Sequence, residues 1–79
     1  MVVRETPLEL ARRRVREAEQ RVEVQRELVR ELTRKRLATH DAEELLLIFE
    51  RTRQVLREHL AEEERTHDGA HDPPLNRPK

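Results

Sequence analysis

The chain has 79 residues, of which 43% are charged and 34% apolar, and seventeen basic residues balance seventeen acidic ones to a formal net charge of zero. The chain has no cysteine, which rules out disulfides and thiolate metal sites. It has one aromatic residue and one glycine, which disfavours β-sandwiches, β-barrels and glycine-rich phosphate loops. A chain of this length makes at most one small domain. No apolar run approaches a membrane span and no signal-peptide core is present at the start, so we expect a cytoplasmic protein.

The first predicted helix covers residues 7–36, after a flexible N-terminus of residues 1–5. Thr6, Pro7 and Glu9 form a helix start with a capping box. Apolar or small residues then recur in steps of three and four, at Leu8, Ala11, Val15, Ala18, Val22, Val29 and Leu32. This spacing is typical of the a/d repeat of a coiled-coil helix.

The second predicted helix covers residues 40–65, after a turn of residues 37–39. Thr39 is the expected N-cap, and Asp41 and Glu43 place negative charge in the first turn, where the helix dipole favours it. Its predicted inner row comprises Ala42, Leu45, Phe49, Thr52, Leu56 and His59. Residues 66–79 hold the only glycine and three of the four prolines, which predicts a disordered tail.

A turn this short predicts an all-α fold, a two-helix antiparallel coiled-coil hairpin over residues 6–65. Positions whose numbers add to about 76 or 77 then face each other, which places Ala18 opposite His59 and Gln25 opposite Thr52. The polar layer of Gln25 and Thr52 is expected to set the register of the helices, as polar core residues do in coiled coils. The alternative is that Gln25 lies at a wet edge of the seam.

A lone hairpin of this size is marginally stable, because two helices that touch along one line bury little apolar surface. The run from Leu45 to Phe49 is apolar around the whole helix, so part of it must face something other than the first helix. We therefore predict a homodimer that forms a four-helix bundle. The residues expected at the dimer or partner interface are Leu46, Leu47, Ile48, Phe49 and Val55. The alternative for Leu47 is an ordinary exposed leucine.

Side chains that could carry chemistry are few. The chain contains no serine and no cysteine, and the acidic run at residues 62–64 is typical of a solvated helix face. His59 is expected to be a satisfied seam histidine, with a phosphoryl-accepting histidine as the alternative. His67 and His71 could hold a metal weakly in the tail, but Gly69 and the prolines argue against a helix there. We expect no enzymatic activity, no metal and no cofactor.

An arginine cluster marks the first helix. Residues 1–36 hold eleven bases and seven acids, a net charge of +4, whereas residues 37–79 hold six bases and ten acids, a net charge of −4. Arg12, Arg13, Arg14 and Arg16 could contact the phosphates of nucleic acid. Acids interleave with these bases and no aromatic stacking groups accompany them. The alternative is that the first helix pairs electrostatically with the acidic second helix.

Several segments resemble a known group of proteins. These segments are Arg14-Val15, residues 19–22, residues 25–29, residues 42–46 and Phe49-Glu50. They are similar to small uncharacterised helical-hairpin proteins common in alphaproteobacteria. The resemblance covers residues 11–60 and implies a bacterial, cytoplasmic setting without a known activity or site. The group has Gly-His-Asp before its second helix, where this chain has Arg36-Leu37-Ala38, so a different turn geometry is expected.

Together these observations predict a non-enzymatic interaction module, an adaptor or regulatory hairpin that dimerises and contacts a protein partner through a helix face. A nucleic-acid-binding bundle and a phosphotransfer-like signalling module around His59 are the alternatives.

Overall fold

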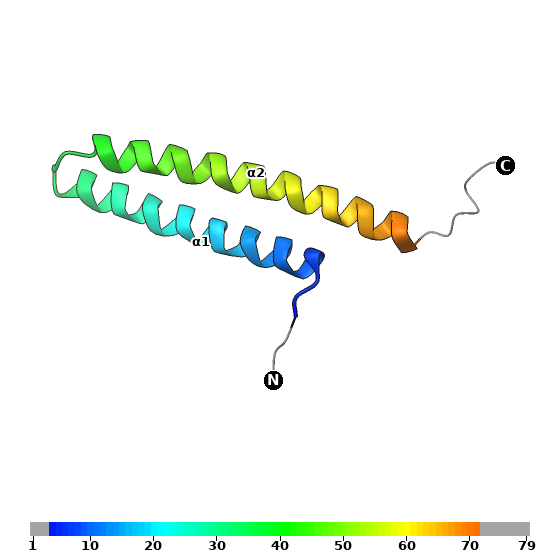
Figure 1. Cartoon of the computed structure of the whole chain (residues 1–79). Coiled ribbons are helices and arrows are strands. Elements are labelled where there is room, and N and C mark those ends of the chain that lie inside the picture. The colour runs from blue at the N-terminus through cyan, green and yellow to red at the C-terminus, as the bar shows by residue number, and fades with distance from the viewer. Residues whose placement is uncertain (1–3, 72–79) are drawn as a thin grey trace.

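The computed structural model describes the backbone of residues 4–71 and the side chains of residues 4–67, which form two helices, α1 (Pro7–Arg34) and α2 (His40–His71). The helices lie side by side and antiparallel, joined by one short turn (Figure 1). This confirms the predicted all-α antiparallel hairpin. No helix in the described part of the chain is long and apolar enough to cross a membrane.

The start of α1 is the predicted capping box. The Glu9 amide donates to the Thr6 hydroxyl at 3.0 Å, and the Thr6 amide donates to the Glu9 carboxylate at 3.0 Å. Pro7 occupies the first helical turn, where its missing N–H leaves no hydrogen bond unmade. The two reciprocal bonds satisfy amides that a helix start otherwise leaves to water, and they fix where α1 begins.

The connection after α1 is longer than predicted: α1 ends at Arg34, and the connection covers residues 35–39 where residues 37–39 were predicted. The Leu37 amide donates to the Leu32 carbonyl at 2.8 Å, and the Arg36 amide donates to the Thr33 carbonyl at 3.0 Å. This pair of bonds is a Schellman motif, which requires a left-handed residue at its centre. Arg36 takes that conformation with φ of 59°, at a position where glycine is usual.

The second helix starts where predicted and ends later. It begins at His40, directly after Thr39, and the Glu43 amide donates to the Thr39 carbonyl at 2.8 Å. It continues to His71, six residues past the predicted end at residue 65, with Gly69 inside the helix. A glycine in a helix interior costs about 1 kcal/mol and does not by itself end the helix. The part of the predicted tail at residues 72–79 lies outside the described residues.

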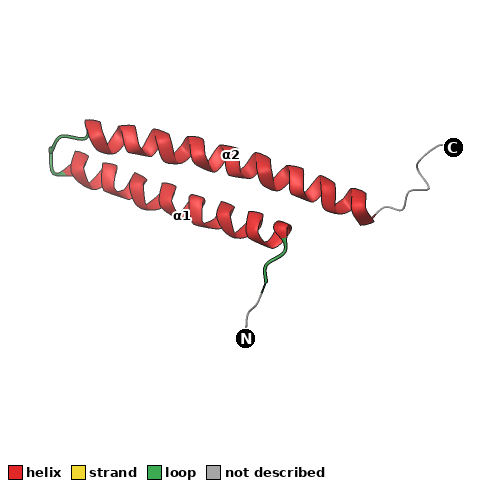
Figure 2. Cartoon of the chain, viewed as in Figure 1, coloured by secondary structure: helices red, strands yellow, loops and turns green. Residues whose placement is uncertain are grey.

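The core follows the predicted row of α1. Val15, Ala18 and Val22 are buried, and Val22 is fully enclosed, while Leu8, Ala11, Val29 and Leu32 are half-buried. Figure 2 shows α1 and α2 lying side by side, and because α2 is the only helix that packs on α1 among the described residues, the buried row is the side of α1 that contacts α2. Only three apolar side chains among those described are buried, so the single hairpin has a very small core.

The inner row of α2 differs from the prediction by a rotation of the helix. Its half-buried members are Ala42, Leu46, Phe49, Arg53, Leu56, Leu60 and Glu63, again in steps of three and four. The predicted row shares Ala42, Phe49 and Leu56, but Leu45, Thr52 and His59 are exposed. The observed rotation turns Leu46 and Leu60 inward, with Arg53 half-buried between them and its Nε enclosed without a hydrogen-bond partner among the described residues. The predicted rotation would instead turn one leucine, a threonine and a histidine inward. Burial of apolar surface therefore favours the observed row.

Candidate interaction surface

Two ion pairs join the helices and define one face of the hairpin. Arg26 pairs with Glu50 at 3.3 Å, and Arg57 pairs with Glu19 at 2.9 Å. The numbers 26 and 50, and likewise 19 and 57, add to 76, which agrees with the predicted register. We call the side of the hairpin that carries these pairs the ion-paired face.

Exposed apolar side chains lie on the opposite side. Successive residues of a helix point 100° apart. Relative to the buried row of each helix, Val24 and Leu28 therefore point away from Arg26, and Leu45, Ile48 and Val55 point away from Glu50 and Arg57. The five side chains that share this side are large and exposed: Val24, Leu28, Leu45, Ile48 and Val55. We call this side the apolar face.

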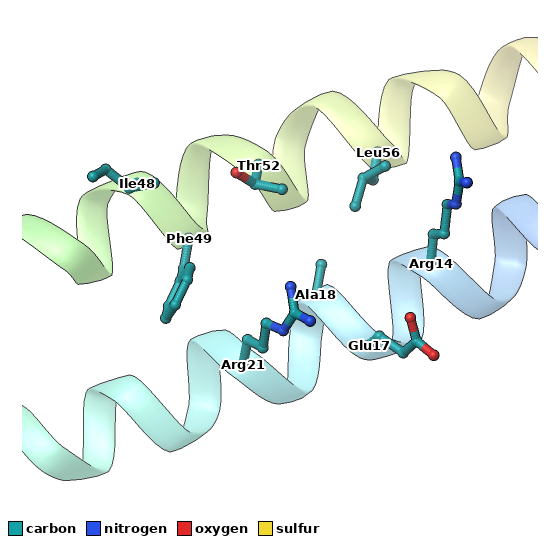
Figure 3. Close-up of a pocket in the computed structure, with 8 residues that line it drawn as sticks. All are labelled: Arg14, Glu17, Ala18, Arg21, Ile48, Phe49, Thr52 and Leu56. Atoms are coloured by element: carbon teal, nitrogen blue, oxygen red, sulfur yellow. The ribbon is translucent and has the colours of Figure 1, made fainter.

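The seam between the helices is open on the apolar face. A hollow of about 290 Å³ lies there, lined by Arg14, Glu17, Ala18, Arg21, Ile48, Phe49, Thr52 and Leu56 (Figure 3). A second hollow of about 490 Å³, also lined by Phe49, continues along α1 past Val24 and Gln25. The ring of Phe49 is thus half-buried between two hollows that no other part of the described chain fills.

The charged groups of the first hollow come from α1. Arg14 and Arg21 make no hydrogen bond or ion pair among the described residues, whereas Glu17 accepts from Arg13 at 3.0 Å. The only hydroxyl of the lining is that of Thr52, and the only carboxylate, that of Glu17, is hydrogen-bonded to Arg13 and not to this hydroxyl. The hollow is therefore suited to apolar contact bordered by two unpaired guanidinium groups.

The predicted interface residues divide between three environments. Ile48 and Val55 lie on the apolar face, where they are exposed as expected. Phe49 belongs to the inner row and also lines both hollows. Leu46 is half-buried on the inner row, so α1 covers part of its side chain, and its place in a dimer interface stays a prediction. Leu47 is exposed but points toward the ion-paired side, away from Ile48, and it fits the alternative of an ordinary exposed leucine.

The predicted polar layer is half correct. Gln25 is 6% exposed within the seam, so it does not lie at a wet edge. Its side-chain amide donates to the backbone carbonyl of Ala42 at 2.9 Å. Thr52 is exposed and does not pair with it, because α2 is rotated relative to the prediction. The single side chain of Gln25 thus links α1 to the first turn of α2.

The arginine cluster does not form one surface. Arg13 donates two hydrogen bonds to Glu5, at 2.8 and 2.9 Å, and a third to Glu17. This contact lowers the pKa of Glu5 below its ordinary value, chiefly through the hydrogen bonds from Arg13. Arg12, Arg14 and Arg16 make no ion pair among the described residues. Arg12 and Arg16, four residues apart, share one side of α1, but Arg14 lies about 200° from Arg12 and points away from it. The four guanidinium groups therefore do not follow one line of phosphates.

The expected pairing of a basic helix with an acidic one is a minor effect. Only the Arg26–Glu50 and Arg57–Glu19 pairs cross between the described parts of α1 and α2, and they run in opposite directions. The other ion pairs lie within one segment of the chain, for example Lys35 with Glu31 at 3.4 Å and the close contact of Arg30 with Glu27. The unequal charges of the two helices are therefore not neutralised inside the hairpin.

The histidines do not assemble a site. His59 is exposed and borders a small hollow, together with Leu10 and Glu63, at the end of the hairpin away from the turn. It is therefore not the seam histidine that was predicted. His67 lies on α2, in a segment predicted to be tail, and the side chain of His71 lies outside the described residues.

One cluster with metal-ligand chemistry was not predicted. His40, Asp41 and Glu44 bring ligand atoms within 4.8 Å of one another, and His40 pairs with Glu44 at 3.3 Å. All three side chains are exposed in the first turn of α2, where the helix dipole disfavours a cation. The arrangement fits an acidic helix start better than a metal centre.

Sequence reasoning missed Val24, Leu28 and Leu45 as members of the apolar face. The signal for Leu45 is a second row on α2, at positions 45, 48, 52, 55 and 59, which repeats in the same three- and four-residue steps as the inner row. When two such rows share a helix, each indicates a neighbour. One neighbour here is α1, and the second row has none among the described residues.

No protein-family model matches this chain, and neither a curated protein nor a solved structure matches it. The resemblance to alphaproteobacterial hairpin proteins therefore stays a prediction.

Proposed function

We propose that this chain is a non-enzymatic helical interaction module, an adaptor or regulatory hairpin that homodimerises and engages protein partners through its helix faces. The observation that carries the proposal is the apolar face, five large exposed side chains beside an open seam. Contiguous apolar surface of this kind is typical of a protein–protein contact. A cytoplasmic setting and the absence of a cofactor remain part of the proposal.

The small core supports a second layer of helices. Val15, Ala18 and Val22 are the buried apolar residues of the described chain, and the burial of each contributes at most about 1.5–3 kcal/mol. The chain has no disulfide to stabilise the hairpin, so further stabilisation has to come from burying more apolar surface. Covering the apolar face would bury that surface.

The test is sedimentation velocity of the wild type and of two matched variants. Ile48→Gln changes a side chain that is 57% exposed on the apolar face, whereas Leu47→Gln changes its neighbour, 63% exposed, on the other side. We expect the wild type to be dimeric at micromolar concentration. Ile48→Gln should weaken the dimer roughly 30-fold, because each copy loses about 1 kcal/mol of apolar burial. Leu47→Gln should leave the dimer unchanged. A wild type that stays monomeric and folded would refute the dimer.

A further inference from the structure

Two arrangements let a two-fold axis bring two apolar faces together. When both turns lie at the same end of the bundle, α1 of one copy lies over α2 of the other. When the turns lie at opposite ends, α1 lies over α1 and α2 over α2. Both give antiparallel neighbours and an isologous contact, so the choice depends on how charge and apolar side chains are distributed along the face.

Charge favours the arrangement with both turns at the same end. α1 holds eight bases and six acids, a net charge of +2, and α2 holds four bases and nine acids, a net charge of −5. These charges are not neutralised within the hairpin, where two ion pairs cross in opposite directions. Stacking α1 on the partner's α2 sets opposite charges against each other, whereas the other arrangement sets like charges together.

The register of the apolar side chains favours the same arrangement. A two-fold axis along the hairpin keeps every residue at its level, so α1 meets the partner's α2 in the register that the ion pairs set within one chain, with numbers adding to 76. Leu28 then meets the partner's Ile48, and Val24 lies one helical turn from Leu28 on the same helix. Arg14, which has no ion pair with the described residues of its own chain, meets the partner's Glu62.

Turning one hairpin end over end loses these contacts. Val24 and Leu28 lie in the half of α1 near the turn, whereas on the same side Arg14 lies in the other half and Arg21 at the middle of the helix. At full overlap the apolar half of each α1 would cover the half that carries Arg14 in the other copy, and the two Arg21 side chains would lie near each other. Val24 and Leu28 can meet the same residues of the partner only if one hairpin slides along the other. The half of each hairpin that lies away from its turn is then left uncovered.

We infer that the apolar face is covered by a second copy of this chain, with both turns at the same end, so that α1 of each copy packs on α2 of the other. This inference rests on the proposed homodimer and assigns its geometry. The contact closes the hollows beside Phe49 and places Arg14 and Arg21 against the acidic helix of the partner. The ion-paired faces remain outermost, where they are available to a further protein.

The turn offers a direct readout of this geometry, because the chain has no cysteine and a single substitution creates a unique label site. Ala38→Cys, in the exposed turn, is spin-labelled and the distance between labels in the full-length dimer is measured by pulsed electron paramagnetic resonance. Turns at the same end predict a distance below about 30 Å, from layers packed 8–10 Å apart plus the label linkers. Turns at opposite ends predict about 42 Å at full overlap, the length of a 28-residue helix, and about 36 Å after the slide that matches Val24 and Leu28 with their own copies.

Oxidative cross-linking gives an independent check. A mixture of Leu28→Cys and Ile48→Cys chains should form a mixed disulfide in at least tenfold excess over disulfides between identical chains. Leu47→Cys replaces Ile48→Cys as the matched control and should give no mixed product. Circular dichroism of each variant establishes that it is folded.

The outcomes separate the two proposals. A label distance above about 35 Å, or cross-linking of Leu28→Cys chains mainly with each other, overturns the geometry while the dimer stands. A folded monomer in sedimentation overturns both the homodimer and its geometry.

Discussion

Gln25 allows a direct test of how the seam is held together. Its side chain is 6% exposed and donates one hydrogen bond, at 2.9 Å, to the Ala42 carbonyl. Gln25→Leu removes that bond, which contributes about 1 kcal/mol net. The Ala42 carbonyl keeps the i→i−4 bond of its own helix, so no buried acceptor is left unpaired. The new leucine buries more apolar surface than glutamine, which adds about 1 kcal/mol.

The free energy of unfolding of Gln25→Leu should therefore stay within about 1 kcal/mol of the wild type. Gln25→Ala loses the bond and leaves a cavity, and it should cost about 2–3 kcal/mol. Urea unfolding followed by circular dichroism at 222 nm measures both, at one protein concentration because unfolding is expected to be linked to dissociation. If Gln25→Leu were as destabilised as Gln25→Ala, the hydrogen bond would contribute more to stability than the apolar burial that replaces it. The expectation that the two contributions nearly cancel would then be refuted.

Two further predictions concern the turn and the start of the hairpin. Arg36→Gly should raise the stability by about 0.5–1 kcal/mol, because Arg36 is left-handed with φ of 59°; Lys35→Gly, at a φ of −84°, should instead lower it in the same thermal melts. The carboxyl group of Glu5 should titrate below its ordinary pKa in an NMR pH titration, because Arg13 donates hydrogen bonds to its charged form. Since this pKa is lowered by folding, the contact should be present above the ordinary pKa and lost as the pH falls through the lowered one, and Arg13→Gln should restore an ordinary titration.

The parts of the fold that sequence reasoning predicted are those with a local cause. The capping box of Thr6 and Glu9, the buried row of α1 and the start of α2 after Thr39 follow from residues close together in the chain. The left-handed turn residue was harder to predict, because a non-glycine residue at Arg36 hides the Schellman motif.

The rotation of α2 was not predictable from spacing alone. Two rows with the same periodicity share Ala42, Phe49 and Leu56, and both keep apolar residues in steps of three and four. Only packing against α1 distinguishes Leu46 on the inner row from Leu45 on the outer one. For the same reason the predicted interface residues include Ile48 and Val55 of the apolar face but neither of its α1 members, Val24 and Leu28.

The five-residue connection at residues 35–39 has a consequence for how the chain folds. Closing so short a loop costs little entropy, and the bonds at Leu37 and between Gln25 and Ala42 form among residues near it. Contacts between the helices can then form progressively outward, so rapid folding that starts at the turn is expected. The open end, where Thr6 begins α1, should close last and exchange its amide hydrogens first.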